Sequence, residues 1–202
     1  GLPIGQAEWD PADKGRGPLM PTPAPVMLAK YGLAASKQRG QNFLSDENVT
    51  RKVVAAAGVG RDDVVVEVGS GFGALTFGLA EAAGHVIAVE IDSGIARAFR
   101  EEYGDLEGIE LLTQDILDFD FESTAARYGV SCVTVVGNIP YNVTSPLIAR
   151  LIESRDSIAR AVLMIQSEVG ARIIADPGDA DYSTLSVVTR YHAEVRRLFT
   201  VR

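Results

Sequence analysis

The sequence has little of the chemistry that builds disulfides or metal centres. It contains one cysteine, Cys132, and two histidines that stand far apart, His85 and His192. One thiol cannot form a disulfide within the chain, and isolated histidines lack the spacing of metal ligands. We therefore expect no intrachain disulfide, no bound metal and a reducing compartment, the cytoplasm.

Long apolar runs are also absent. The uninterrupted apolar stretches fall well short of a membrane span, and no charged segment followed by an apolar one opens the chain. We expect a protein without membrane contact, and a monomer. With 202 residues, of which 47% are hydrophobic, the chain is long enough for one globular domain with its own core.

Positive charge is scarce and unevenly placed. The chain has 19 Lys and Arg against 27 Asp and Glu, a formal net charge of −8. Residues 61–130 carry 15 acids and 4 bases, whereas residues 27–60 carry 5 bases and 2 acids and residues 131–202 carry 8 arginines and 7 acids. Contacts with phosphate groups therefore belong on the two flanks of an acidic middle. The alternative is an acidic enzyme with scattered surface arginines.

The first part of the chain is rich in proline. Residues 1–26 hold six of the nine prolines and show no apolar periodicity. The run Pro21-Thr22-Pro23-Ala24-Pro25 is unsuited to a helix or a central strand. We predict that residues 1–26 form a flexible tail or arm and that residues 27–202 form the folded domain.

From residue 46 onward, helical and strand patterns alternate. The predicted helices cover residues 49–57, 74–83, 92–103, 145–153 and 167–175. The predicted strands cover residues 64–68, 85–90, 109–113, 132–136, 162–166 and 184–191. Near-continuous Val and Ile runs separated by helices predict an α/β, Rossmann-like fold with a mainly parallel sheet covered on both faces. Ligands bind such sheets at the carboxyl ends of the strands.

A glycine-rich turn follows the first predicted strand and opens a helix. Gly69, Gly71 and Ala74 satisfy the loose dinucleotide fingerprint, and Glu90 at the end of the second strand could hold the ribose of NAD. S-adenosylmethionine also carries a ribose. It is favoured because Glu67 precedes the loop, and because one residue separates Gly71 from the third glycine, Gly73, where the dinucleotide fingerprint has two.

Two further positions favour S-adenosylmethionine. Asp115 ends the third predicted strand, where its carboxylate can accept a hydrogen bond from an adenine amino group. The turn Asn138-Ile139-Pro140-Tyr141 ends the fourth, where a methyl acceptor would sit. For Glu90 and Asp115 taken singly, a solvated loop carboxylate is the alternative.

The turn itself has the groups needed to hold an aromatic amine. The amide oxygen of Asn138 and the carbonyl of Pro140 can both accept hydrogen bonds from one –NH2 group, and Tyr141 offers a ring on which a flipped base can stack. These are the predicted catalytic residues. The alternative is a strand-to-turn proline followed by a buried tyrosine.

The chain resembles the small-subunit ribosomal RNA adenine dimethyltransferases from about Thr22 to its end. The matching segments are Gly40-Gln41-Asn42-Phe43-Leu44, the glycine loop with Leu75-Thr76, Glu90-Ile91-Asp92, Gln114-Asp115, Gly137 to Asn142, Gln166-Ser167-Glu168-Val169 with Arg172, and Asp181-Tyr182-Ser183-Thr184-Leu185-Ser186. Family members are class I methyltransferases that dimethylate N6 of two adjacent adenines near the 3′ end of 16S-type rRNA, within a pre-30S particle.

The resemblance implies a role for each predicted cofactor-binding residue. Asn42 and Leu44 touch the methionine end of S-adenosylmethionine, Gly69 the loop side, Glu90 the ribose hydroxyls and Asp115 the adenine. Asn138 lies between the cofactor and the target amine. Phe43 and Tyr141 are candidates for the wall that leaves room for a first methyl group, with simple packing as the alternative for Phe43.

The chain also departs from the family pattern. Family members continue into a last strand and a small helical domain that grips RNA, both of which we expect to be absent here. Ile139 is commoner in the sister family, the large-subunit rRNA methyltransferases of macrolide resistance, and Ser167 replaces a frequent lysine. Large-subunit methylation and an assembly factor that acts mainly by binding therefore remain as alternatives.

Overall fold

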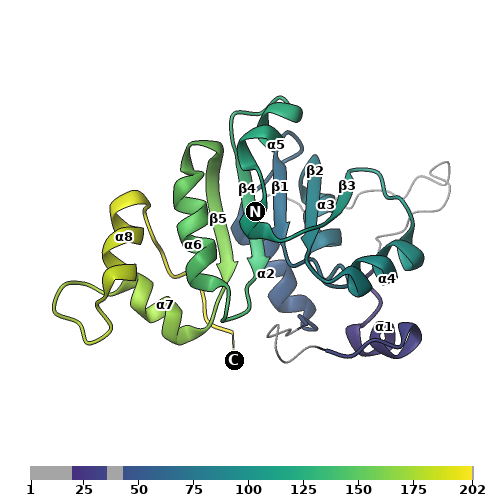
Figure 1. Cartoon of the computed structure of the whole chain (residues 1–202), viewed down its shortest axis with the longest axis horizontal. Coiled ribbons are helices and arrows are strands. Elements are labelled where there is room, and N and C mark those ends of the chain that lie inside the picture. The colour runs from purple at the N-terminus through teal and green to yellow at the C-terminus, as the bar shows by residue number, and fades with distance from the viewer. Residues whose placement is uncertain (1–19, 36–42, 202) are drawn as a thin grey trace, which may run out of the picture.

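The computed structural model describes residues 20–35 and 43–201. Its centre is a five-stranded sheet in the order β3-β2-β1-β4-β5, in which every strand pair is parallel (Figure 1). The strands are β1 Val64–Val68, β2 His85–Glu90, β3 Ile109–Thr113, β4 Val133–Asn138 and β5 Ile158–Met164. The chain runs from β1 outward to β3 and then crosses back to β4. The strand order therefore reverses between β1 and β4, the place where open α/β sheets bind ligands.

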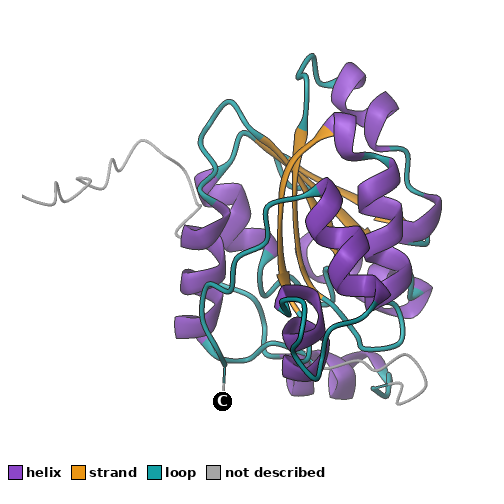
Figure 2. Ribbon diagram, turned by 90° about the vertical axis from the view of Figure 1, so that its left-hand side faces the viewer, coloured by secondary structure: helices purple, strands orange, loops and turns teal. Residues whose placement is uncertain are grey.

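Helices flank the sheet on both sides, as Figure 2 shows. They are α1 Ala24–Tyr31, α2 Glu47–Ala57, α3 Thr76–Ala82, α4 Ser93–Tyr103, α5 Phe121–Arg127, α6 Thr144–Glu153, α7 Ser167–Ile174 and α8 Thr184–His192, with short 3-10 helices η1 Ile116–Asp118 and η2 Arg155–Ser157. The predicted fold, a parallel sheet with helices on both faces, is confirmed.

The two faces of the sheet are covered by different helices because strand side chains alternate. On β1, Val64, Val66 and Val68 pack in one cluster with residues of η1, α5 and α6, while Val65 packs in another with residues of α2 and α3. Every residue of β1 is buried, including Glu67. The continuous β-branched run of this central strand follows from burial on both of its faces.

Acidic side chains begin several of these helices. Asp46 caps α2, and Asp92 caps α4 by accepting from the amides of Gly94 and Ile95. Asp115 caps η1 in the same way. These carboxylates satisfy amides that have no partner within the helix, and they fix where the loops after β2 and β3 turn.

The strand predicted over residues 184–191 is wrong: this segment is helix α8. The β-branched residues Thr184, Val187 and Val188 favour a strand by propensity, but Ser183 and Ser186 cap the helix reciprocally. Ser186 and Thr189, one helical turn apart, are buried, and the Ser186 hydroxyl donates to the carbonyl of Arg172 on α7. Packing against α7 therefore overrides strand propensity.

The predicted boundary between the arm and the folded domain, after residue 26, is also wrong. Helix α1 begins at Ala24, so residues 24–26 belong to the folded part, and Pro25 stands in the first turn, where an amide needs no partner. Residues 1–19 of the predicted arm lie outside the described residues. Helices α1 and α5 were not predicted, and β5 begins four residues earlier than expected. Cys132 precedes β4 and is not within it.

Candidate functional site

A cavity of about 480 Å3 opens at the carboxyl ends of the strands. Its walls come from the glycine loop after β1, the loops after β2 and β3, and the turn after β4. Residues 20–24, residues 43–45 and parts of α2, α3 and α4 also contribute to the lining. The volume is that of a small-molecule site, and its place is the switch point of the sheet.

The glycine loop presents backbone to this cavity. Gly69 has a φ of 70°, a conformation that side chains with a Cβ rarely adopt, and a Cβ there would meet no atom within 4 Å. The amide of Gly69 donates to the carbonyl of Val89 at 2.9 Å, which holds the loop against β2. The open side of Gly69 therefore faces space that a ligand can occupy.

Gly137 brings the turn after β4 close to this loop. A Cβ on Gly137 would lie 2.8 Å from the carbonyl oxygen of Val68, so only glycine allows β4 to approach the end of β1 this closely. The next residue, Asn138, ends β4 and lines the cavity. The close approach places Asn138 beside the glycine loop.

Glu90 stands at the end of β2 and is 5% exposed. One carboxylate oxygen accepts from the amide of Gly71 at 2.9 Å and the other from the amide of Asp92 at 2.8 Å. These two amides orient the carboxylate at the edge of the cavity. Glu90 lines the cavity and offers an acceptor for ligand hydroxyl groups.

Glu67 is the most buried acid of the site, at 1% exposed. Burial raises its pKa to about 7, the nearby carboxylate of Glu90 adds to the rise, and the Thr76 hydroxyl opposes it without reaching hydrogen-bond geometry. Within the described part of the chain, Glu67 Oε2, Ser70 Oγ and Thr76 Oγ1 are buried without a hydrogen-bond partner. Glu67 and Ser70 line the cavity, so a polar ligand bound there would supply partners for their two atoms.

Asp115 and Gln114 form the wall after β3. Asp115 Oδ1 accepts from the amide of Leu117 at 3.0 Å, which fixes the carboxylate at the start of η1. The amide of Gln114 donates to the carbonyl of Glu90 at 3.1 Å. Both residues line the cavity, on the same edge of the sheet as Glu90. The carboxylates of Glu90 and Asp115 therefore line the cavity at the ends of β2 and β3, as the sequence predicts.

The turn after β4 is held by its own hydrogen bonds. The amide of Ile139 donates to the carbonyl of Met164 at 2.8 Å. The carbonyl of Pro140 accepts from the amide of Val143 at 3.2 Å and from the hydroxyl of Thr144 at 3.0 Å. These two bonds use both acceptor positions of that carbonyl, so Pro140 can accept from an amine only by releasing one of them.

Tyr141 is 56% exposed and does not belong to the lining of the cavity. The structural alternative for this turn, a buried tyrosine, is therefore wrong. An exposed ring three residues after Asn138 is available to a base that approaches from outside the protein.

The residues before α2 are only partly described. Leu44 and Phe43 line the cavity, and the Phe43 ring stacks on Phe72 with centroids 5.1 Å apart. Asn42 lies outside the described residues. Phe43 therefore both packs the loop and forms a wall.

Sequence reasoning missed one wall of the cavity. Residues 20–24 line it, although their prolines indicated a tail. The side chains that dock this segment and the helix after it are Thr22, Lys30 and Tyr31, which form no recognisable motif.

Two further findings concern the described residues alone. Within them, no group of three or more His, Cys, Asp or Glu side chains is placed to hold a metal ion. No helix in residues 20–35 and 43–201 is long and apolar enough to cross a membrane.

Residues 32–202 match the sequence model of the family described as ribosomal RNA adenine dimethylase. Over 171 residues the chain is 40% identical to ribosomal RNA small subunit methyltransferase A of Geobacter sulfurreducens, an alignment that covers 85% of this chain and 62% of that protein. The chain spans 62%, 61% and 60% of the length of three such curated relatives.

Two solved structures are also similar to this chain. A dimethyladenosine transferase from Plasmodium falciparum is similar with a TM-score of 0.63 and 32% identity, over 72% of this chain and 51% of that one. The 23S rRNA methyltransferase ErmE is similar with a TM-score of 0.62 and 30% identity, over 74% of this chain and 57% of that one.

Proposed function

The chain belongs to the ribosomal RNA adenine dimethylase family, and from this membership we propose that it dimethylates N6 of two adjacent adenines near the 3′ end of small-subunit rRNA. The methyl donor is S-adenosylmethionine and the substrate is the rRNA of a pre-30S particle. The proposal includes action as a monomer in the cytoplasm. One observation supports the proposed methyl transfer: Asn138 lines the same cavity as Glu90 and Asp115.

The residues of the cavity fit S-adenosylmethionine. Glu90 would accept hydrogen bonds from the ribose hydroxyls, and Asp115 from the adenine amino group. Leu44 would contact the methionine end together with Asn42, and the open backbone of Gly69 would contact the cofactor on the side of the glycine loop. The orphaned carboxylate oxygen of Glu67 offers a further acceptor within the glycine loop. No metal is required.

The chemistry is positioning and electrostatics. When bound, S-adenosylmethionine supplies an electrophilic methyl group on a sulfonium. Asn138 would accept a hydrogen bond from the adenine N6 amine, which favours a pyramidal nitrogen and aims its lone pair at that methyl group. The proton leaves to solvent after transfer, so the reaction needs no dedicated base.

The second acceptor and the stacking platform also come from this turn. Pro140 would accept from the amine after its carbonyl releases Val143 or Thr144, or the adjacent carbonyl of Ile139 would take that place. The exposed ring of Tyr141 would stack on the flipped adenine, which leaves the RNA helix to reach the site.

Primer extension on rRNA tests the target. The gene is expressed in a bacterium that lacks its own small-subunit adenine dimethyltransferase, and reverse-transcription stops are mapped on both rRNAs. Two methyl groups on N6 block base pairing, so we expect stops at two adjacent adenines near the 3′ end of the small-subunit rRNA, and none with Asn138→Ala.

Large-subunit rRNA is the second candidate substrate. Ile139 favours it, and the similarity to the 23S rRNA methyltransferase ErmE supports it. New stops confined to the large-subunit rRNA would establish this alternative and exclude the first.

A further inference from the structure

A segment from the beginning of the described chain closes one side of the cavity. Residues 20–24 line it, and α1 follows directly. In Figure 1, α1 lies below α4, at the carboxyl edge of the sheet. We call residues 20–33 the N-terminal strap.

The strap packs on the residues that surround the glycine loop. Met27 of α1 is fully buried in a cluster with Phe72, Ile95 and Ala98. Further along, a Cβ on Gly94 would lie 3.1 Å from a methyl group of Leu33, so the first turn of α4 and the end of the strap are in close contact. Phe72 and Ile95 lie close in sequence to Gly71 and Asp92, the two amide donors to Glu90.

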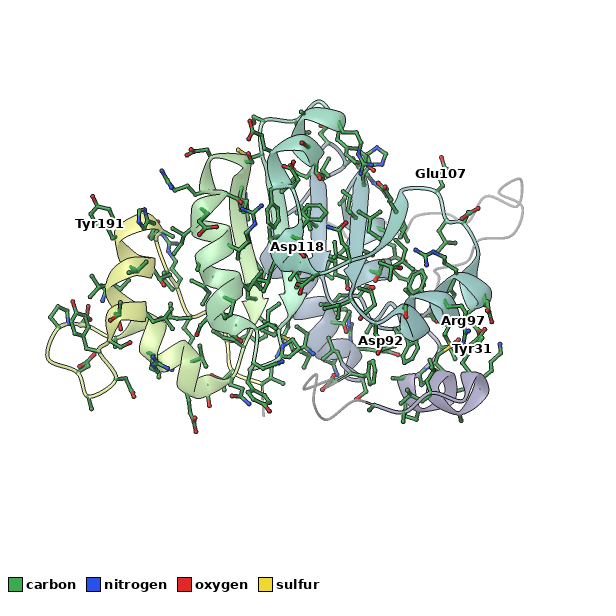
Figure 3. All side chains as sticks on the ribbon, in the orientation of Figure 1. Tyr31, Asp92, Arg97, Glu107, Asp118 and Tyr191 are labelled. Carbon is green, nitrogen blue, oxygen red and sulfur yellow. The ribbon has the colours of Figure 1, made fainter. Side chains whose placement is uncertain are left out.

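Three side chains of the strap donate hydrogen bonds to one carboxylate. Glu102, near the end of α4, accepts from the hydroxyl of Thr22 at 3.3 Å, the ammonium of Lys30 at 2.5 Å and the hydroxyl of Tyr31 at 2.8 Å. The Glu102 side chain is 16% exposed, against 55% for Lys30. The hydrogen bond from Lys30, followed by that from Tyr31, lowers the pKa of Glu102 below its usual value. Figure 3 shows Tyr31 at the junction of α1 and α4.

A second path joins the strap to the glycine loop itself. The amide of Thr22 donates to the hydroxyl of Tyr103 at 2.8 Å, and that hydroxyl donates to the carbonyl of Phe72 at 3.5 Å. Phe72 follows Gly71, whose amide holds the carboxylate of Glu90. The strap is therefore connected through Tyr103 to the backbone that orients the predicted ribose acceptor.

We propose that Glu102 is a positioning residue for cofactor binding, because it holds the N-terminal strap on α4 and so fixes the cavity wall formed by residues 20–24. The inference rests on the proposed function, since it takes the cavity as the site of S-adenosylmethionine. With the strap anchored, the wall is ordered before the cofactor arrives. Without the anchor, cofactor binding must also pay for ordering the strap, and affinity falls.

The test compares two neighbouring carboxylates of α4. Glu102→Gln keeps the shape of the side chain but removes its charge, and Glu101→Gln is the matched control, because Glu101 forms an exposed ion pair with Arg97 on the same helix. Calorimetry measures the affinity for S-adenosylmethionine, and hydrogen exchange measures the protection of residues 20–33. Turnover assays on the full-length protein separate KM for the cofactor from kcat.

We expect Glu102→Gln to weaken cofactor binding about tenfold, the order expected for losing hydrogen bonds to a charged group. Exchange in residues 20–33 rises, KM for the cofactor rises and kcat stays unchanged, while Glu101→Gln binds like the wild type. Tyr31→Phe removes one of the three bonds and has a smaller effect, which does not add to that of Glu102→Gln because the two share one anchor. If Glu102→Gln fails to fold, Tyr31→Phe carries the same test.

Two results for the Glu102→Gln variant overturn the inference while the proposed function stands. One is faster exchange in residues 20–33 with unchanged affinity for S-adenosylmethionine, and the other is unchanged exchange in residues 20–33. A wild-type protein that binds no S-adenosylmethionine overturns the proposed function and the inference with it. Behaviour of the wild type therefore distinguishes the two failures.

Discussion

The backbone amide of Gly71 donates a 2.9 Å hydrogen bond to the carboxylate of Glu90, which ties the glycine loop after β1 to the end of β2. A second amide, that of Asp92, holds the other carboxylate oxygen. The group predicted to bind the cofactor ribose is thus fixed in place by backbone from two loops.

Replacing this carboxylate should cost most of the cofactor affinity. In Glu90→Gln the amide nitrogen faces one of the two backbone donors, and the charged acceptor for the ribose hydroxyls is lost. We expect binding of S-adenosylmethionine to weaken by about a hundredfold, close to 3 kcal/mol. Calorimetry measures this change. The control is Asp118→Asn, a substitution of an exposed carboxylate. Equal affinity in both variants would show that Glu90 only holds the loop.

The buried carboxyl of Glu67 makes folding dependent on pH. Its pKa is about 7 in the folded chain, against 4.5 ordinarily, so between these pH values the folded state keeps a proton that the unfolded state has lost. The stabilising contribution is complete below pH 4.5 and is lost as pH rises toward 7, an effect of up to about 3 kcal/mol.

Glu67→Gln should remove this dependence in the cofactor-free protein. Urea unfolding at several pH values between 4.5 and 8 gives the free energy of unfolding of variant and wild type, and the difference between the two should change with pH. Glu107→Gln, at an exposed position, is the control (Figure 3). Parallel stability curves for wild type and Glu67→Gln would contradict the raised pKa.

Tyr141 should affect the RNA and not the cofactor. Because its ring is exposed and outside the cavity lining, Tyr141→Ala is expected to leave the affinity for S-adenosylmethionine unchanged. Loss of base stacking, about 1–3 kcal/mol, should reduce methyl transfer by roughly 10- to 100-fold. Tyr141→Phe keeps the ring and should retain most activity. Methylation assays in parallel with calorimetry check both points, and an inactive Phe variant would refute the stacking role.

Ser186 should stabilise α8. Its hydroxyl donates to the carbonyl of Arg172, and its side chain accepts from the amide of Ser183 at 3.0 Å. Ser186→Ala leaves the carbonyl of Arg172 and the amide of Ser183 without these partners, so we expect a loss of about 1–2 kcal/mol in the free energy of unfolding. Denaturant unfolding measures the loss, with Val188→Ala, a substitution at an exposed position of the same helix, as control. Equal stability of the two variants would argue against the cap.

Much of the fold and the site could be predicted from local sequence. The buried β-branched run of β1 and the carboxylates Glu90 and Asp115 at successive strand ends follow from burial and topology, which leave a clear pattern. Helix α8 could not be predicted, because its Val and Thr residues favour strands and only packing on α7 shows that Ser186 is buried.

The N-terminal strap is the larger omission. Its prolines suit a tail when read alone, and only the folded chain brings Thr22 and Tyr31 to Glu102, more than 70 residues away in sequence. The hydrogen bonds of the Pro140 carbonyl are equally invisible in the sequence, because they depend on the turn that places Thr144 behind it.

We propose that Asn138 holds the adenine amine beside the cofactor. The most direct test of this proposal is the transfer of labelled methyl groups from S-adenosylmethionine to pre-30S particles that lack dimethyladenosine, with wild-type full-length protein and its Asn138→Ala variant. With the wild type we expect two methyl groups on each of the two adenines. For the variant we expect a rate about 100- to 1,000-fold lower with nearly unchanged cofactor affinity. A variant that methylates the particles at the wild-type rate would contradict the proposal.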